Sequence, residues 1–92
     1  MENGSEDAGD AAFRRAVGLR IRVWRVVHGR SQDDLARAAG VTRNFVSAIE
    51  RGAQGLDAVR LRRLAAAMGI ELAELLAEPE VASRRVPEPS PA

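Results

Sequence analysis

Apolar residues recur at helical spacing near the start of the chain. Phe13, Val17, Ile21 and Trp24 stand four, four and three positions apart, which puts them on one face of an α-helix. The arginines between them lie mainly off this stripe. The pattern predicts a long amphipathic helix over residues 11–28, with its apolar face turned toward a core.

Four shorter helices are predicted after it, over residues 32–39, 43–51, 58–68 and 71–76. Ser31, Thr42 and Asp57 precede three of them and are typical N-cap residues, whose side-chain oxygens accept from the free amides of a first turn. Glycine readily adopts the left-handed conformation that closes a helix. The helix-closing glycines are Gly29, Gly40, Gly52 and Gly69. Since no useful length of strand-like alternation occurs, the sequence predicts an all-α, compact five-helix domain.

The two ends differ in composition from the segment between them. Residues 1–10 carry four acids and no basic residue, and residues 78–92 contain all four prolines. Neither end has enough apolar surface to bury, and proline cannot continue a helix. We therefore expect a domain over residues 11–77, preceded by a disordered acidic arm (1–10) and followed by a disordered Pro-rich tail (78–92).

Composition excludes several classes of chemistry. The chain has no cysteine, so disulfide frameworks, thiolate zinc sites and cysteine nucleophiles are excluded. One histidine among five scattered serines does not supply a nucleophile, a base and an orienting group. We expect no catalytic site, no metal and no cofactor. No apolar run approaches the roughly 20 residues of a membrane span, and we expect a cytoplasmic protein.

The central segment is cationic. Residues 11–76 hold twelve arginines against six acids, a formal charge of +6. A cationic compact domain suits a polyanionic partner such as nucleic acid, although arginines on solvated helix faces would give the same count.

Residues 32–51 have the internal spacing of a helix-turn-helix. With Gln32 as the first position, Ala36 is fifth, Gly40 ninth and Val46 fifteenth. A small side chain at Ala36 lets the two helices approach, Gly40 permits a positive φ in the turn, and Val46 seals the helix pair. A helical hairpin formed for packing alone would not need this combination. The spacing therefore indicates the helix-turn-helix motif, whose second helix enters the DNA major groove.

The run SQDDLARAAGVTRNFVSAIERG resembles the Cro/repressor type of helix-turn-helix transcriptional regulators, the XRE family, and the resemblance extends over about residues 13–76. It implies binding to double-stranded DNA and a salt bridge between Arg25 and Glu50. Arginine can donate two hydrogen bonds to one guanine, and asparagine can pair with adenine. The expected DNA-binding residues are Gln32, Thr42, Arg43, Asn44, Ser47, Arg25 and Gln54.

We expect a repressor that acts as a homodimer on a palindromic operator, because one module this small buries too little DNA for tight specific binding. Leu72 and Leu75, three positions apart, are expected to serve the dimer interface more than the core of one chain. The alternative is an antitoxin or protein-interaction adaptor of a toxin–antitoxin pair, in which an arm folds onto an unidentified protein partner and the domain binds its own promoter.

Overall fold

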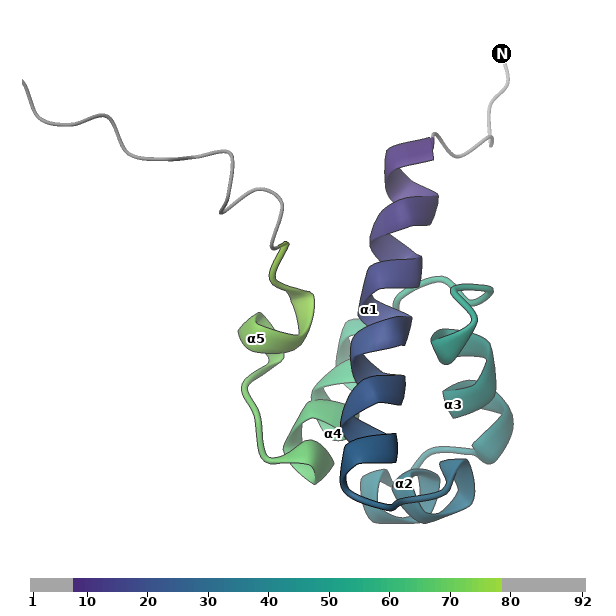
Figure 1. Ribbon diagram of the computed structural model, residues 1–92, viewed down its shortest axis with the longest axis vertical. Coiled ribbons are helices and arrows are strands. Elements are labelled where there is room, and N and C mark those ends of the chain that lie inside the picture. The colour runs from purple at the N-terminus through teal and green to yellow at the C-terminus, as the bar shows by residue number, and fades with distance from the viewer. Residues whose placement is uncertain (1–7, 79–92) are drawn as a thin grey trace, which may run out of the picture.

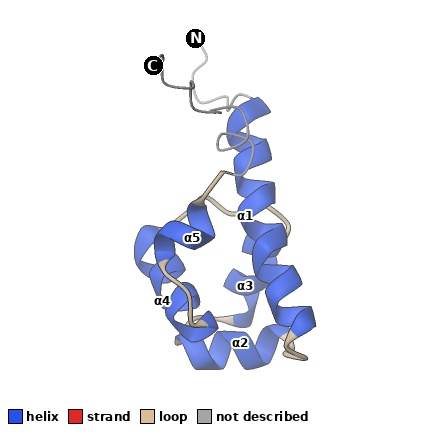
Figure 2. Ribbon diagram, turned by 60° about the vertical axis from the view of Figure 1, so that its left-hand side comes forward, coloured by secondary structure: helices blue, strands red, loops and turns tan. Residues whose placement is uncertain are grey.

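The computed structural model describes residues 8–78, which form five helices and no strand (Figures 1 and 2). The helices are α1 (Ala8–Val27), α2 (Gln32–Ala39), α3 (Arg43–Glu50), α4 (Ala58–Met68) and α5 (Leu72–Leu76). The expected all-helical, five-helix fold is confirmed. Within the described residues, no helix is both long and apolar enough to cross a membrane.

The largest difference from the predicted bounds is at the start of α1. This helix begins at Ala8, so residues 8–10 are helical and do not belong to a disordered arm. Alanine is the best helix former, and Asp10 in the first turn is favoured by the positive end of the helix dipole. The rest of the predicted arm and tail, residues 1–7 and 79–92, lies outside the described residues.

The helix ends follow the predicted capping residues. Ser31 Oγ accepts from the Asp34 amide at 2.9 Å, and the Asp34 carboxylate accepts from the Ser31 amide at 2.9 Å, which completes a capping box. Thr42 and Asp57 cap α3 and α4 in the expected way. The four predicted glycines all have positive φ, from 65° to 75°.

The long helix α1 lies between α3 and α5, and α2 packs against α3 and α4 (Figure 1). The contact between α1 and α3 depends on Gly18. A Cβ atom at this position would lie 2.8 Å from the Glu50 carbonyl oxygen and closer still to that of Ile49. The backbone of α3 therefore rests directly on α1, which fixes how α3 is presented.

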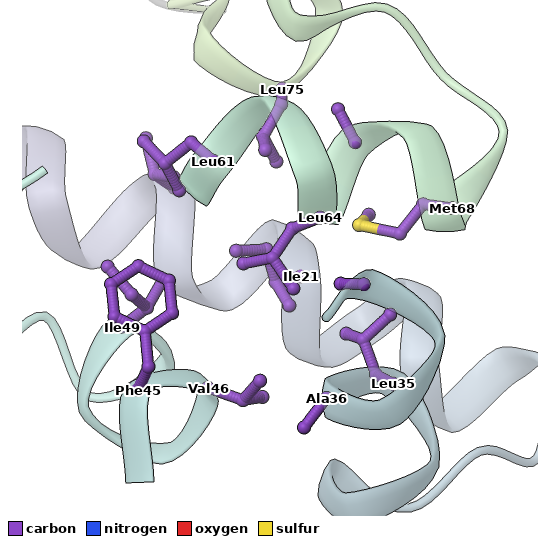
Figure 3. Close-up of a cluster of buried hydrophobic side chains, with 13 residues drawn as sticks. Ile21, Leu35, Ala36, Phe45, Val46, Ile49, Leu61, Leu64, Met68 and Leu75 are labelled. Atoms are coloured by element: carbon purple, nitrogen blue, oxygen red, sulfur yellow. The ribbon is translucent and has the colours of Figure 1, made fainter. Parts of the chain in front are cut away.

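The core contains buried apolar side chains from all five helices (Figure 3). They are Val17, Ile21, Leu35, Ala36, Ala39, Phe45, Val46, Ile49, Leu61, Leu64, Ala65, Met68 and Leu75. Phe13 and Trp24, predicted on the same stripe as Val17 and Ile21, are partly buried and pack against this cluster.

The expectation that Leu75 serves a dimer more than the core is wrong. Its side chain is 0% exposed and points toward the side chains of α4 (Figure 3). The physical reason is that Arg20 holds α5 against α1, with Nη1 donating to the carbonyl oxygens of Glu74 at 2.8 Å, Leu75 at 2.9 Å and Ala77 at 3.0 Å. Leu72 is only half-buried, at the edge of the core.

Candidate nucleic-acid interface

The first turn of α3 presents free polar side chains. Thr42 Oγ1 accepts from the Phe45 amide at 3.0 Å, which starts the helix. Arg43 and Asn44 follow it and are exposed, and within residues 8–78 neither side chain makes a hydrogen bond or ion pair. Their donors and acceptors are therefore free to meet an external partner.

Beside this turn lies an open hollow of about 380 Å³ between α3, the following loop and the start of α4. The hollow brings together four of the predicted DNA-binding residues: Thr42, Asn44, Ser47 and Gln54. Its remaining lining residues are Phe45, Ala48, Arg51 and Arg60. Phe45 is 4% exposed and belongs to the hydrophobic core, so it forms the floor of the hollow and is not a polar contact.

Two arginines of this hollow were not among the predicted site residues. Arg51 Nη1 donates to Ser47 Oγ at 2.6 Å. Arg60 lies over the Phe45 ring, 4.1 Å from its centroid, and its Nε donates to Asp57 at 3.0 Å. The signal for Arg51 was available in the sequence, because a residue four positions after Ser47 shares its helix face. Arg60 comes from another helix, so only the tertiary fold reveals it.

A second cluster joins α1, α2 and α3 at one carboxylate. Arg25 Nε donates to Glu50 Oε2 at 2.7 Å and Nη2 donates to Oε1 at 2.9 Å, so the expected salt bridge is confirmed and is bidentate. Gln32 Nε2 donates to the same carboxylate at 3.1 Å. The Glu50 side chain is 4% exposed and that of Arg25 is 15% exposed.

This carboxylate orients both of its donors. Hydrogen bonding to Glu50 raises the pKa of Arg25, whose Nη1 also donates to the Arg30 carbonyl oxygen at 3.0 Å. Gln32 keeps a second amide N–H that is not used by Glu50. The predicted site residues thus form two groups, one in the hollow and one around Glu50, while Arg43 is exposed outside both.

The chemistry available here is hydrogen bonding and positive charge. Within residues 8–78, no three His, Asp or Glu side chains are placed to hold a metal ion together. Arginine and amide donors beside a short helix start suit phosphate oxygens and base edges.

A family model described as helix-turn-helix, HTH_3, matches residues 21–75, a range that contains both groups. The chain belongs to this family. It is a DNA-binding transcriptional regulator of the XRE type, so the resemblance noted in residues 31–52 is confirmed.

Individual relatives agree with this assignment. The chain is 36% identical over 68 residues to the Neisseria hypothetical transcription factor of Neisseria meningitidis serogroup B, over 74% of this chain and 64% of that protein, which is less than two thirds of its length. The restriction-modification controller protein C.AhdI from Aeromonas hydrophila is 38% identical, with a TM-score of 0.67 over 70% of this chain and 97% of its own. SinR, a master regulator for biofilm formation solved in complex with DNA, is 32% identical, with a TM-score of 0.62 over 66% of this chain and 98% of its own.

Proposed function

We propose that this regulator represses transcription by binding a palindromic operator sequence-specifically as a homodimer. The observation that carries the proposal is the first turn of α3, where Arg43 and Asn44 are exposed and have no partner within residues 8–78. The helix that carries them is fixed to α1 at Gly18 and through Glu50. A rigid helix with free donors at its start is what reading of base edges requires.

Each polar residue is assigned a role by its chemistry. Arg43 and Asn44 read bases, while Thr42 and Ser47 offer short hydroxyls to a phosphate or a base. Phosphate contacts are assigned to residues that lie around the first turn of α3 and carry amide or guanidinium donors. These are Arg25, Gln32, Arg51, Gln54 and Arg60.

The homodimer is proposed because two modules spaced one duplex turn apart, about 34 Å, read a two-fold site that one module could not bind tightly. Repression follows from an operator that overlaps a promoter. Leu72, half-buried on α5, remains one proposed contact between the two copies.

Selection of bound sites from random duplex DNA tests the proposal. The expected product is an inverted repeat whose half-site centres lie about 10 base pairs, or one duplex turn, apart. Enrichment of an isolated half-site would contradict the homodimer, and no enrichment over the starting pool would contradict sequence-specific binding.

Substitutions in α3 test the assigned roles on the selected site. Arg43→Ala and Asn44→Ala should each cost about 1–3 kcal/mol of binding and relax the preference at different base pairs. Gln32→Ala should weaken binding to all sequences alike, because a phosphate contact carries little sequence information. Arg62→Ala, which removes an exposed arginine of α4 outside the hollow, is the control. Equal losses on selected and random DNA for the α3 variants would refute base reading.

A further inference from the structure

Helix α1 has a second apolar face, beside the one that packs in the core. Leu19, Val23 and Val26 on this face are 58%, 51% and 61% exposed. The small residues Gly9, Ala12 and Ala16 continue the same stripe toward the start of the helix and are also exposed. The six positions alternate by three and four residues, which is the spacing of a coiled-coil seam.

An apolar hollow of about 530 Å³ runs beside this seam. Its lining residues are Ala16, Leu19, Arg20, Val23, Trp24, Val27 and His28. Arg20 is held in place by its three hydrogen bonds to α5, and the Trp24 ring stacks on His28 with centroids 4.2 Å apart. The walls of the hollow are thus formed before any partner arrives.

We propose that a second copy of the chain packs its own α1 antiparallel on this face. In one antiparallel register every layer of the seam pairs a small residue with a large one. Ala16 meets Leu19 of the second copy, Ala12 meets Val23, and Gly9 meets Val26. Such pairs close a helix interface without gaps or overlap. A parallel arrangement would instead set Ala12 against Ala12 and Val23 against Val23, which leaves a gap at one end and separates the helices at the other.

The charges beside the seam do not favour the parallel arrangement. They do predict how the dimer responds to salt. Arg15 and Arg22 flank the seam, and the antiparallel register puts Arg15 near Arg22 of the second copy. Both are exposed, so their repulsion is small and is screened by salt. The dimer should therefore tighten as salt is raised. An acidic helix of another protein on the same face would bind more weakly at high salt.

The size of the seam sets the expected strength. Residues 9–26 span about 27 Å of helix, and a strip one helix wide is smaller than the roughly 800 Å² that each partner of a standard interface buries. We therefore expect a dimer that dissociates on dilution. The inference rests on the proposed homodimer and adds its interface. Its tests are carried out without DNA, so their failure would leave half-site recognition by α3 standing.

Cysteine pairing tests the register, because the natural chain contains no cysteine. Ala12→Cys and Val23→Cys change exposed positions and should leave the fold intact. A mixture of the two variants should form a disulfide between chains on mild oxidation, while each variant alone should not. Self-cross-linking of each variant alone would overturn the antiparallel register. No cross-linking in the mixture would overturn the proposal.

Sedimentation equilibrium tests the surface. The apparent mass of the unmodified protein should rise from 9.9 kDa toward twice that value as its concentration increases. Leu19→Gln/Val23→Gln should raise the dimer dissociation constant at least about tenfold, with unchanged helicity and unchanged binding to a half-site. Val59→Gln, at a 57% exposed valine of α4, is the matched control. A monomer at all concentrations, or a dimer weakened by Leu72→Gln and not by the α1 changes, would overturn the proposal.

Discussion

Single residues determine how α3 is held. Glu50 accepts three hydrogen bonds from Arg25 and Gln32, so one carboxylate connects the end of α3 to two other helices. Burial of this carboxylate is tolerated because its charge is paired. The residues around it therefore affect both stability and the orientation of the first turn of α3.

Replacing Glu50 with glutamine should destabilise the fold by about 2–3 kcal/mol, because the Arg25 guanidinium loses charge-assisted hydrogen bonds while it stays largely buried. Binding to a half-site should fall as well, since Arg25 and Gln32 lose their common anchor. Urea unfolding measures the first effect. Asp33→Asn, at an exposed ion pair with Arg37, is the control and should change little. An equally small loss at Glu50 would contradict its orienting role.

Gly18 controls the distance between α1 and α3. Gly18→Ala should cost about 3 kcal/mol or more, because the new methyl group meets carbonyl oxygens of the α3 backbone, which cannot move aside as a side chain can. Gly55→Ala is the matched control, since nothing lies within 4 Å of a Cβ atom there. Thermal unfolding of the two variants decides the matter: similar midpoints would mean that α3 shifts at little cost.

Residues that act on close neighbours could be predicted from the sequence. The capping residues and helix-closing glycines needed only their local pattern, and the Arg25–Glu50 pair came from the resemblance to a known family. Gly18 could not be predicted in this way, because an isolated glycine within a helix does not reveal what packs against it. A glycine within a helix costs about 1 kcal/mol relative to alanine. That cost was the available signal that packing requires glycine at position 18.

At the scale of helices, lengths were easier to predict than orientations. The bounds of α2 and α4 match the predicted ranges, because caps and apolar spacing are local. The orientation of α5 was not predictable. Leu72, Leu75 and Leu76 all suit a buried face, and the residue that selects Leu75 is Arg20, 54 positions from Glu74.

The capping carboxylates make stability depend on pH. Hydrogen bonds from backbone amides, of Ser31 to Asp34 and of Arg60 to Asp57, lower the pKa of each carboxyl group. The folded state therefore binds these protons less readily than the unfolded state. The stability they contribute is fully present above the ordinary aspartate pKa of about 3.9 and is lost as pH falls through the lower folded value.

Asp34→Asn/Asp57→Asn should remove this dependence. The variant should be less stable than the natural chain at pH 7, and the difference should shrink as the pH falls below about 4. Urea midpoints measured from pH 7 to pH 3 give both profiles. Parallel profiles would show that other carboxyl groups determine the acid sensitivity.

At the scale of the whole molecule, opposite charges are separated along the sequence. Residues 11–76 carry a formal +6 and residues 1–10 carry −4. Acids attached to a cationic DNA-binding domain oppose the approach of phosphates at low salt, where the range of charge interactions is long.

Neutralising Glu2, Glu6 and Asp7 should therefore tighten binding to random duplex DNA at low salt. The gain should shrink as the Debye length falls from about 10 Å at 0.1 M salt to about 3 Å at 1 M. Neutralising Glu78, Glu80 and Glu88 makes the same change in net charge and is the control. Equal gains would assign the effect to net charge alone, and no gain at any salt concentration would contradict the prediction.

The bonds from Arg20 to the end of α5 also have a consequence for the order in which the protein folds during synthesis. A five-residue helix is too short to persist by itself, and Leu75 supplies part of the core. A growing chain that lacks α5 has no carbonyl partners for Arg20 and leaves Leu61 and Leu64 less covered. The final native packing thus waits for residue 77, whose carbonyl accepts the last of the three bonds. In the finished protein, amide hydrogen exchange in α5 should require its release from α1, so its protection should fall on substitution of Arg20 with methionine.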